Sequence, residues 1–276
     1  MTDAGWHIDE RCINCGAAQV IAPDIIVESG GQSVFRRQPR AQDEIDSAWR
    51  AALLCPTASV HAPRGMKPPP GLFPQELAPG LYRLGYNARS SYGAHSYAVD
   101  IEGARMMVDS PRWTRRLVDW FEAAGGLGHV LLTHRDDIAD AKRYAKHFGA
   151  RVWIHADDAD AAPFATDILN GDNPSEPLPG LRVIPLPGHT KGSIAYLVGG
   201  TYLFTGDSLS WSHRDKALRA VREVCWYDWD SQLASLERLR NECFSWILAG
   251  HGGSIEADPD ELQRALDTML TRLKAA

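Results

Sequence analysis

Short apolar runs bounded by glycine, proline or charged residues recur along the chain from about residue 82 onward. They predict strands at 82–86, 97–101, 104–108, 129–132, 151–155, 181–185, 194–198 and 201–204. Apolar residues at helical spacing predict amphipathic helices at 112–124, 138–148, 231–241 and 259–274. Because strands and helices mix throughout, the pattern indicates an α/β (α+β) domain of layered sheets and helices.

Local residues refine two of these elements. Ser110-Pro111 predicts the start of the helix at 112–124, with serine as N-cap and proline at the first helical position. Gly199-Gly200 predicts the hairpin turn between the strands at 194–198 and 201–204.

A proline-rich stretch at 62–79 interrupts the pattern, because consecutive prolines can extend neither a helix nor a central strand. We therefore expect a small domain at 1–63, a linker at 64–76 and a large domain at 77–276.

Composition narrows the class of protein. The chain has 276 residues, 44% of them hydrophobic and 23% charged, which is typical of a soluble globular protein. It has no run of about 20 apolar residues and no N-terminal secretion signal, so we expect a cytoplasmic protein with no membrane partner. The net charge of −6 disfavours a nucleic-acid partner and leaves a small molecule as the expected substrate.

Four short segments place a metal-capable side chain at the end of an apolar strand. They are LLTHRDDIAD with His134, PLPGHTKGS with His189, LFTGDSL with Asp207 and ILAGHG with His251. A strand fixes the direction of such a ligand, and the loop after it leaves room for an ion. Imidazole and carboxylate together suit Zn²⁺, Fe²⁺ or Mn²⁺, so the sequence predicts a metal site.

With these motifs, the chain from about Leu77 onward resembles the metallo-β-lactamase superfamily, and most closely its glyoxalase II-like hydrolases. The resemblance implies a four-layer αββα sandwich with its metals at one edge. Thr133-His134 aligns with the start of the family motif T-H-x-H-x-D-H, and the segments PGHT, TGD and GHG match its later motifs. Asp109 in VDS would support the site.

The first motif departs from the family. In direct register Asp136 replaces its second histidine, Ile138 its aspartate and Ala139 its last histidine. A shift of two residues brings Asp140 to the aspartate position and leaves Ala141 at the last histidine. In either register the second metal position lacks an imidazole. We therefore expect one ion of Zn²⁺ or Fe²⁺, and a second ion remains an alternative.

Three functions compete on this basis. The first is hydrolysis of a small ester, thioester or lactone, with Asp136 or Asp137 as an extra oxygen ligand and Asp137 or Asp140 orienting the attacking water. The second is a mononuclear non-haem iron oxidoreductase resembling persulfide dioxygenases, because His134, His189 and Asp207 form a two-His, one-carboxylate set. The third is a binding protein whose site no longer turns over.

The N-terminal segment carries its own cysteine pattern. Cys12 and Cys15, then Ile-Ala-Pro at 21–23 and Cys55-Pro56, resemble a single-cluster bacterial ferredoxin, but Ala18 stands where the third cysteine should fall. An iron–sulfur cluster with one open or foreign ligand, a zinc site that borrows His7 or His61, and a fold without metal remain alternatives. If a cluster binds, a redox partner is implied.

Overall fold

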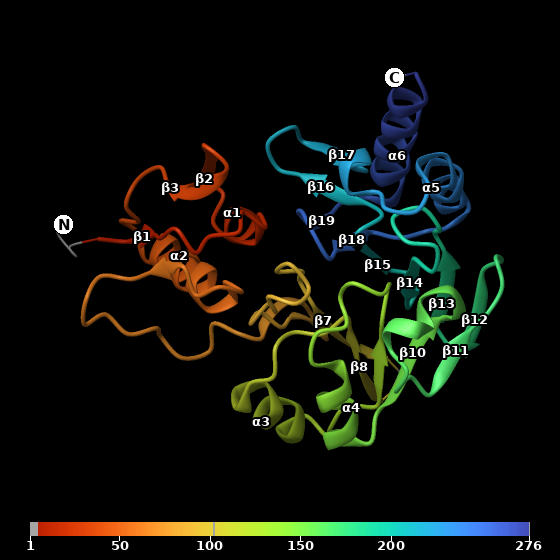
Figure 1. Cartoon of the computed structure of the whole chain (residues 1–276), viewed down its shortest axis with the longest axis horizontal. Helices are drawn as coiled ribbons and strands as arrows, with labels where there is room; N and C mark the ends of the chain where they lie inside the picture. The colour runs from red at the N-terminus through yellow and green to blue at the C-terminus, as the bar shows by residue number, and fades with distance from the viewer. Residues whose placement is uncertain (1–4, 102, 276) are drawn as a thin grey trace.

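The computed structural model describes residues 5–101 and 103–275, and two facing β-sheets form its main body (Figure 1). The first sheet has the strand order β11-β10-β9-β8-β7-β6-β5. Its strands, in chain order from β5, are Gln75–Ala78, Leu81–Arg83, Tyr97–Ile101, Ala104–Val108, His129–Leu131, Arg151–His155 and Asp167–Leu169. Strands β8 to β11 pair in parallel, whereas β5 to β8 pair in antiparallel fashion.

The second sheet has the order β12-β13-β14-β15-β18-β19. Its strands are Ser175–Leu178, Leu181–Pro185, Ile194–Val198, Tyr202–Gly206, Trp246–Ala249 and Ile255–Glu256. A separate hairpin of β16 (Ser210–Ser212) and β17 (Ala217–Arg219) lies between β15 and α5 in the chain. Gly199 and Gly200 both have positive φ, and Thr201 N donates to Val198 O at 3.1 Å, which confirms the predicted turn between β14 and β15.

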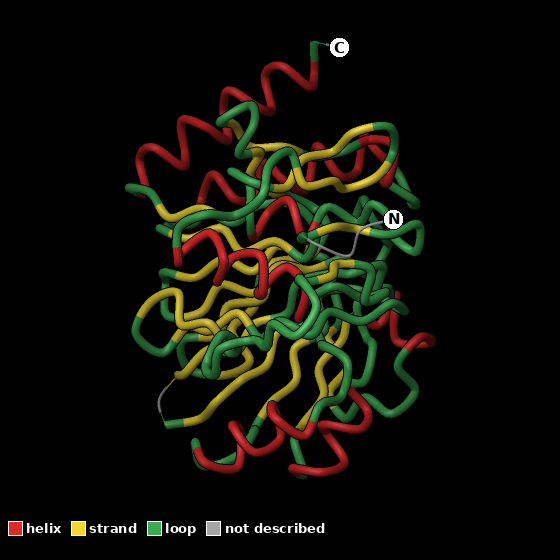
Figure 2. The backbone as a smooth tube through the Cα atoms, turned by 90° about the vertical axis from the view of Figure 1, so that its left-hand side faces the viewer, coloured by secondary structure: helices red, strands yellow, loops and turns green. Residues whose placement is uncertain are grey.

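The two sheets pack face to face around one apolar layer. Tyr97 and Val108 of the first sheet belong to the same buried cluster as Tyr196 and Phe204 of the second. Helices α3 (Arg115–Ala123) and α4 (Ala141–Phe148) cover the outer face of the first sheet. Helices α5 (Trp229–Leu236) and α6 (Pro259–Lys274) cover the second. Figure 2 shows the strands in the middle with helices above and below, which is the predicted αββα sandwich.

Two helices were predicted to begin three residues too early: the structure starts α3 at Arg115 and α4 at Ala141. Helix α3 begins at Arg115 with Thr114 as its N-cap, whose Oγ1 accepts from Leu117 N at 3.3 Å. Residues 110–113 instead form a loop, because Arg112 N bonds the carbonyl of Tyr86 at 2.9 Å and its guanidinium reaches the N-terminal segment. A tertiary anchor thus overrides the local helix signal of Ser110-Pro111.

The N-terminal segment forms a small α+β unit. Its elements are β1 (His7–Ile8), α1 (Ala17–Ile21), β2 (Ile26–Ser29), β3 (Gln32–Phe35), α2 (Gln42–Leu54) and β4 (Val60–His61). They surround a separate apolar core that includes Trp6, Ile26 and Trp49. The proline-rich stretch is anchored at both cores, since Leu72 packs into the small core and Phe73 into the large one. We propose that the domains meet at this stretch.

The small unit contacts the large one through polar bonds and close packing. The Arg112 guanidinium donates to Leu53 O at 2.8 Å and Cys55 O at 3.1 Å, and Asn87 N donates to Leu54 O at 3.1 Å. No helix in the part of the chain that the structure describes is long and apolar enough to cross a membrane.

Candidate metal centre

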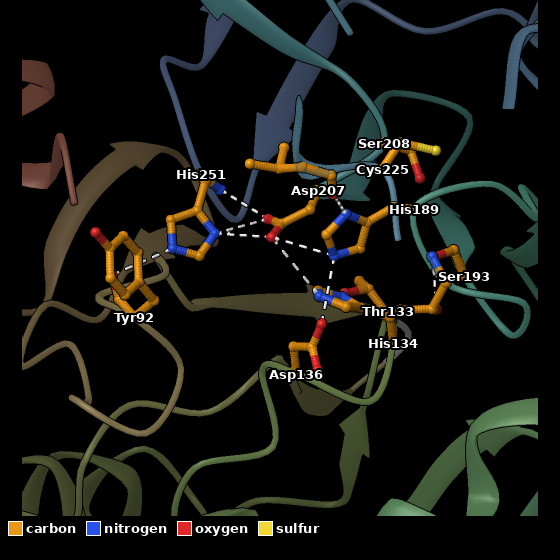
Figure 3. A network of polar contacts seen from close by, with 12 residues as sticks. Tyr92, Thr133, His134, Asp136, His189, Ser193, Asp207, Ser208, Cys225 and His251 are labelled. Atoms are coloured by element: carbon orange, nitrogen blue, oxygen red, sulfur yellow. Dashed lines mark hydrogen bonds and ion pairs between the residues drawn. The ribbon is translucent and has the colours of Figure 1, made fainter. Parts of the chain in front are cut away.

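Four loops at one edge of the sandwich bring the predicted ligands together (Figure 3). His134 follows β9, His189 lies between β13 and β14, and Asp207 follows β15. The Nε2 atoms of His134 and His189 each lie 3.7 Å from Oδ2 of Asp207. These three atoms surround one point, which is the arrangement that a single metal ion requires.

A buried threonine fixes the ring of His134. Thr133 Oγ1 lies 2.9 Å from His134 Nδ1, and it also contacts both carboxylate oxygens of Asp109 at 2.9 and 3.0 Å. Because the hydroxyl donates its proton to the Asp109 carboxylate, it accepts from Nδ1–H of His134. The lone pair of His134 is therefore on Nε2, facing Asp207.

A backbone carbonyl does the same for His189. Its Nδ1 donates to Val224 O at 2.6 Å, which leaves the lone pair on Nε2. The segment after Val224 is tied to the same loop, since Trp226 N donates to His189 O at 2.9 Å and Cys225 Sγ to Gly188 O at 3.0 Å. Sequence reasoning missed this support, because a carbonyl 35 residues away carries no sequence signal.

Both Nε2 atoms are buried and have no hydrogen-bond partner. Buried polar atoms without partners are rare, because losing water without a replacement costs about 1–3 kcal/mol each. Two imidazoles with aligned free lone pairs beside a carboxylate fit a divalent metal such as zinc or iron, which would satisfy all three groups at once.

A second group of ligand atoms lies on the other side of Asp207. It consists of Asp137, Asp207 and His251, whose ligand atoms lie within 4.8 Å of one another. His251 Nδ1 contacts Oδ2 of Asp207 at 2.8 Å, and its Nε2 lies 3.4 Å from Tyr92 O. Asp137 is 1% exposed, and neither of its carboxylate oxygens has a hydrogen-bond partner. This group is richer in oxygen than the first.

Burial and charge set the ionisation of this cluster. Burial lowers the pKa of His134 to about 4, which keeps its ring neutral as a ligand must be. Burial, with the Asp207 charge adding to it, raises the pKa of Asp137 well above its usual range. Burial also disfavours the charged forms of Asp207 and His251, but the attraction between these two charges is the larger effect. This attraction lowers the pKa of Asp207 and raises that of His251 to about 10.

Asp136 and Asp140 fall in different places. Asp136 Oδ2 lies 3.5 Å from His189 Nε2, and its half-exposed side chain reaches the first ligand group from outside. Asp140 is not brought to the centre: its Oδ2 accepts from Trp113 N at 2.6 Å, just before α4. The Asp140 carboxylate thus anchors the loop that precedes α3, and the water-orienting role expected of it stays a prediction.

The glycines that precede the ligands allow close approach. Gly206 has φ +49°, and a Cβ there would lie 2.5 Å from Thr133 Oγ1. A Cβ at Gly250 would lie 2.8 Å from both Asp137 Oδ2 and Asp207 Oδ1, and one at Gly188 would overlap Gln232. A side chain at any of these positions would displace a ligand or the segment that supports it.

An open pocket of about 490 Å³ adjoins the first ligand group. Its walls are Arg135, Asp136, Asp157, Asp158, Thr190, Lys191, Trp226 and Tyr227. The Trp226 side chain is 66% exposed, and its ring centroid lies 6.2 Å from that of His189. The pocket therefore offers a small molecule an aromatic wall and two cationic side chains beside the ligand group.

The N-terminal cysteines meet at a separate pocket. Cys12, Cys15 and Cys55 line it together with Ala18. His7 and His61, the imidazoles considered for a zinc site, stack on each other 4.9 Å apart outside the pocket lining. His61 Nε2 also contacts Asp9 Oδ2 at 2.8 Å.

Comparisons with known proteins match both parts of the chain. Residues 94–270 match the model of the metallo-beta-lactamase superfamily, and residues 8–62 match that of the 4Fe-4S single cluster domain of Ferredoxin I. A hydroxyacylglutathione hydrolase from Acidiphilium cryptum (strain JF-5) is 39% identical over 126 residues, which are 42% of this chain and 49% of that protein. A second, from Cereibacter sphaeroides (strain ATCC 17029 / ATH 2.4.9), is 32% identical over 153 residues, 54% of this chain and 58% of that protein.

The chain thus spans about half the length of these curated relatives. Among solved structures, DIM-1 metallo-beta-lactamase exposed to ceftazidime superposes with a TM-score of 0.53 at 19% identity, over 70% of this chain and 95% of that one. A metallo-beta-lactamase family protein from Thermus thermophilus gives 0.51 at 21% identity, over 72% and 81%. At this identity the likeness shows the fold alone.

Proposed function

Because the chain belongs to the metallo-β-lactamase superfamily, we propose that it is a metal-dependent hydrolase of a small thioester. The observation that carries the proposal is the pair of buried Nε2 atoms, on His134 and His189, that face Asp207 and have no hydrogen-bond partner among the described residues. The names of the two hydroxyacylglutathione hydrolases favour a thioester over an ester or a lactone.

His134, His189 and Asp207 would hold the first ion, Zn²⁺ or Fe²⁺, with Asp136 as a further oxygen ligand. Such an ion supplies Lewis-acid polarisation of a carbonyl and lowers the pKa of water. Asp137, with Asp207 and His251, would hold a second ion or orient the attacking water from the buried side.

The remaining roles belong to the pocket. Trp226 and Tyr227 would contact the apolar part of the substrate, and Lys191 and Arg135 stand where an anionic group would bind. Lys191 Nζ is paired with Asp157 at 2.8 Å and Arg135 with Asp160 at 2.9 Å, so each cation already lies beside a carboxylate. Asp136 faces both the pocket and the ligands, which makes it the proposed proton acceptor when it is not a ligand.

Metal analysis and turnover of a thioester panel test this proposal. We expect the zinc- or iron-loaded protein to hydrolyse a thioester, and His189→Ala to lose both the metal and the activity. His147→Ala is the matched control, because His147 is a surface imidazole paired with Glu122. Loss of neither metal nor activity in His189→Ala, or no turnover by the fully loaded protein, would refute it. Absence of turnover by the fully metal-loaded protein would favour a binding protein.

A second candidate is a mononuclear iron oxidoreductase. The observation that favours it is that the two-His, one-carboxylate group suits Fe(II) and that the cysteine-lined unit packs against the same domain. Oxygen consumption with a persulfide or thiol substrate is the test. Tightly bound zinc without iron in the protein as isolated counts against this function.

A further inference from the structure

The cysteine-lined pocket of the N-terminal unit has three thiols, one fewer than a cluster of four irons requires. Cys12 and Cys15 precede α1, Ala18 lies in the first turn of α1, and Cys55 ends α2. All four side chains line the same pocket. Ala18 therefore stands in space, as well as in sequence, where a fourth thiolate would ligate a cluster.

Among the described residues that line the pocket there is no further thiol, imidazole or carboxylate, and Thr57 Oγ1 donates to Ser59 Oγ at 3.2 Å. Ser33 also lines the pocket, and its Oγ accepts a hydrogen bond from Gln19 Nε2 at 2.9 Å. Ser59 Oγ is engaged with Cys55 Sγ at 3.2 Å. Ala18, Leu54 and Val60 are buried apolar side chains of the same lining, which disfavours water at that corner. The pocket thus does not fit a cluster with four protein ligands.

Nor does the geometry fit zinc. Thiolates on one tetrahedral zinc lie about 3.8 Å apart, since each Zn–S bond is about 2.3 Å. Within residues 5–101 and 103–275, the three thiols are not among the groups of ligand atoms that gather within 4.8 Å. At least two of the three sulfurs therefore lie more than 4.8 Å apart, farther than two thiolates on one zinc ion.

We propose that Cys12, Cys15 and Cys55 hold an iron–sulfur cluster of three irons, whose vacant corner faces Ala18. Each remaining iron then has one thiolate, and the corner without a protein ligand carries no iron. The sulfurs already accept amide hydrogen bonds of the kind that stabilise bound thiolates: Asn14 N donates to Cys12 Sγ at 3.4 Å and Ser59 N to Cys55 Sγ at 3.3 Å.

The contacts place this cluster beside the metal centre. A Cβ at Gly93 would lie 2.7 Å from Cys15 Sγ, so the set of Cys12, Cys15 and Cys55, here called the cysteine cradle, touches the backbone of the large domain. The neighbouring Tyr92 donates its hydroxyl to Ile13 O at 2.5 Å, and its carbonyl lies 3.4 Å from His251 Nε2. One loop thus joins the cysteine cradle to an imidazole of the second ligand group, as Figure 3 shows for Tyr92 and His251.

The test compares the full-length protein with Ala18→Cys after anaerobic reconstitution with ferrous iron and sulfide. We expect Ala18→Cys to gain about one iron per chain at unchanged acid-labile sulfide, because a fourth thiolate completes the set of four. The metal centre adds the same iron to both proteins, so it cancels in the difference. Ala22→Cys is the matched control, since Ala22 is buried in the same unit but does not line the pocket.

Paramagnetic resonance gives a second readout. Three ferric irons hold an odd number of d electrons, so the oxidised wild-type cluster must be paramagnetic. The even-electron cluster of Ala18→Cys has no such requirement, and we expect its signal to disappear. The proposal is overturned if the wild type binds no labile sulfide while Ala18→Cys does. It is equally overturned if both proteins bind the same iron per sulfide.

Discussion

Replacing Gly93 with alanine tests the contact between the two parts of the chain. Gly93 has φ +88°, a left-handed conformation that side chains rarely adopt. An added Cβ would lie 2.7 Å from Cys15 Sγ and 3.1 Å from Pro56 Cγ. Both atoms belong to the N-terminal unit, so the substitution strains the backbone and pushes the small unit away from the large one.

Two costs add at this position. The left-handed conformation costs alanine about 1–2 kcal/mol. Overpacking a close contact typically costs about 1–3 kcal/mol more. We therefore expect Gly93→Ala to lower the free energy of unfolding by about 2–5 kcal/mol. At roughly 2–4 °C per kcal/mol, the melting temperature should fall by about 4–20 °C.

Gly149→Ala separates the two costs. Gly149 also has a left-handed φ, of +67°, but nothing lies within 4 Å of its Cβ position. Urea unfolding of both variants should therefore show a larger loss for Gly93→Ala, by about 1–3 kcal/mol. Limited proteolysis of the proline-rich stretch should also speed up only in Gly93→Ala. Equal losses and equal proteolysis in the two variants would show that the units do not pack as described.

Three further results are expected. Thr133→Val should weaken metal binding about 10–100-fold in chelator competition, because His134 loses the hydroxyl that orients its ring. Asp140→Asn should keep full metal content in elemental analysis yet unfold more easily by about 1–2 kcal/mol in urea, because a weaker acceptor then faces Trp113 N. Burial raises the pKa of Asp109 to about 7, so folding favours its neutral form, and its contribution to stability should fall by about 4 kcal/mol between about pH 4 and 7. Urea unfolding of the metal-free protein should show this fall as the difference between the wild type and Asp109→Asn, because Asp137 and His134 titrate in both proteins.

Six regular elements followed from the sequence because their determinants are local. The strands at 97–101, 104–108, 151–155, 181–185 and 194–198 and the helix at 259–274 have the predicted bounds. Each is a compact apolar run or amphipathic period with a turn signal at its end. The start of α3 was predicted three residues too early, because its position depends on what Arg112 binds far away in the chain.

The first metal motif, too, was determined in part by the local sequence and in part by distant contacts. Spacing placed Asp136 at the second histidine position in direct register and Asp140 at the aspartate position in the shifted register, but it could not choose between the two registers. The structure separates them by their partners: Asp136 lies 3.5 Å from His189 Nε2, whereas Asp140 is bound to a backbone amide. Asp137, which neither register aligned with a ligand, is the carboxylate that joins Asp207 and His251.

By itself, the sequence determined the layered α/β class, the strand ends that carry His134, His189, Asp207 and His251, and the missing thiol at position 18. These follow from periodicity and from residue chemistry, which act over a few neighbours. Only the tertiary structure decided which nitrogen of each imidazole is free, which carboxylate faces the ligands, and that Tyr92 and Gly93 join the cysteine cradle to His251. Those features depend on contacts between atoms tens of residues apart, and only the packed fold brings such atoms within hydrogen-bonding distance.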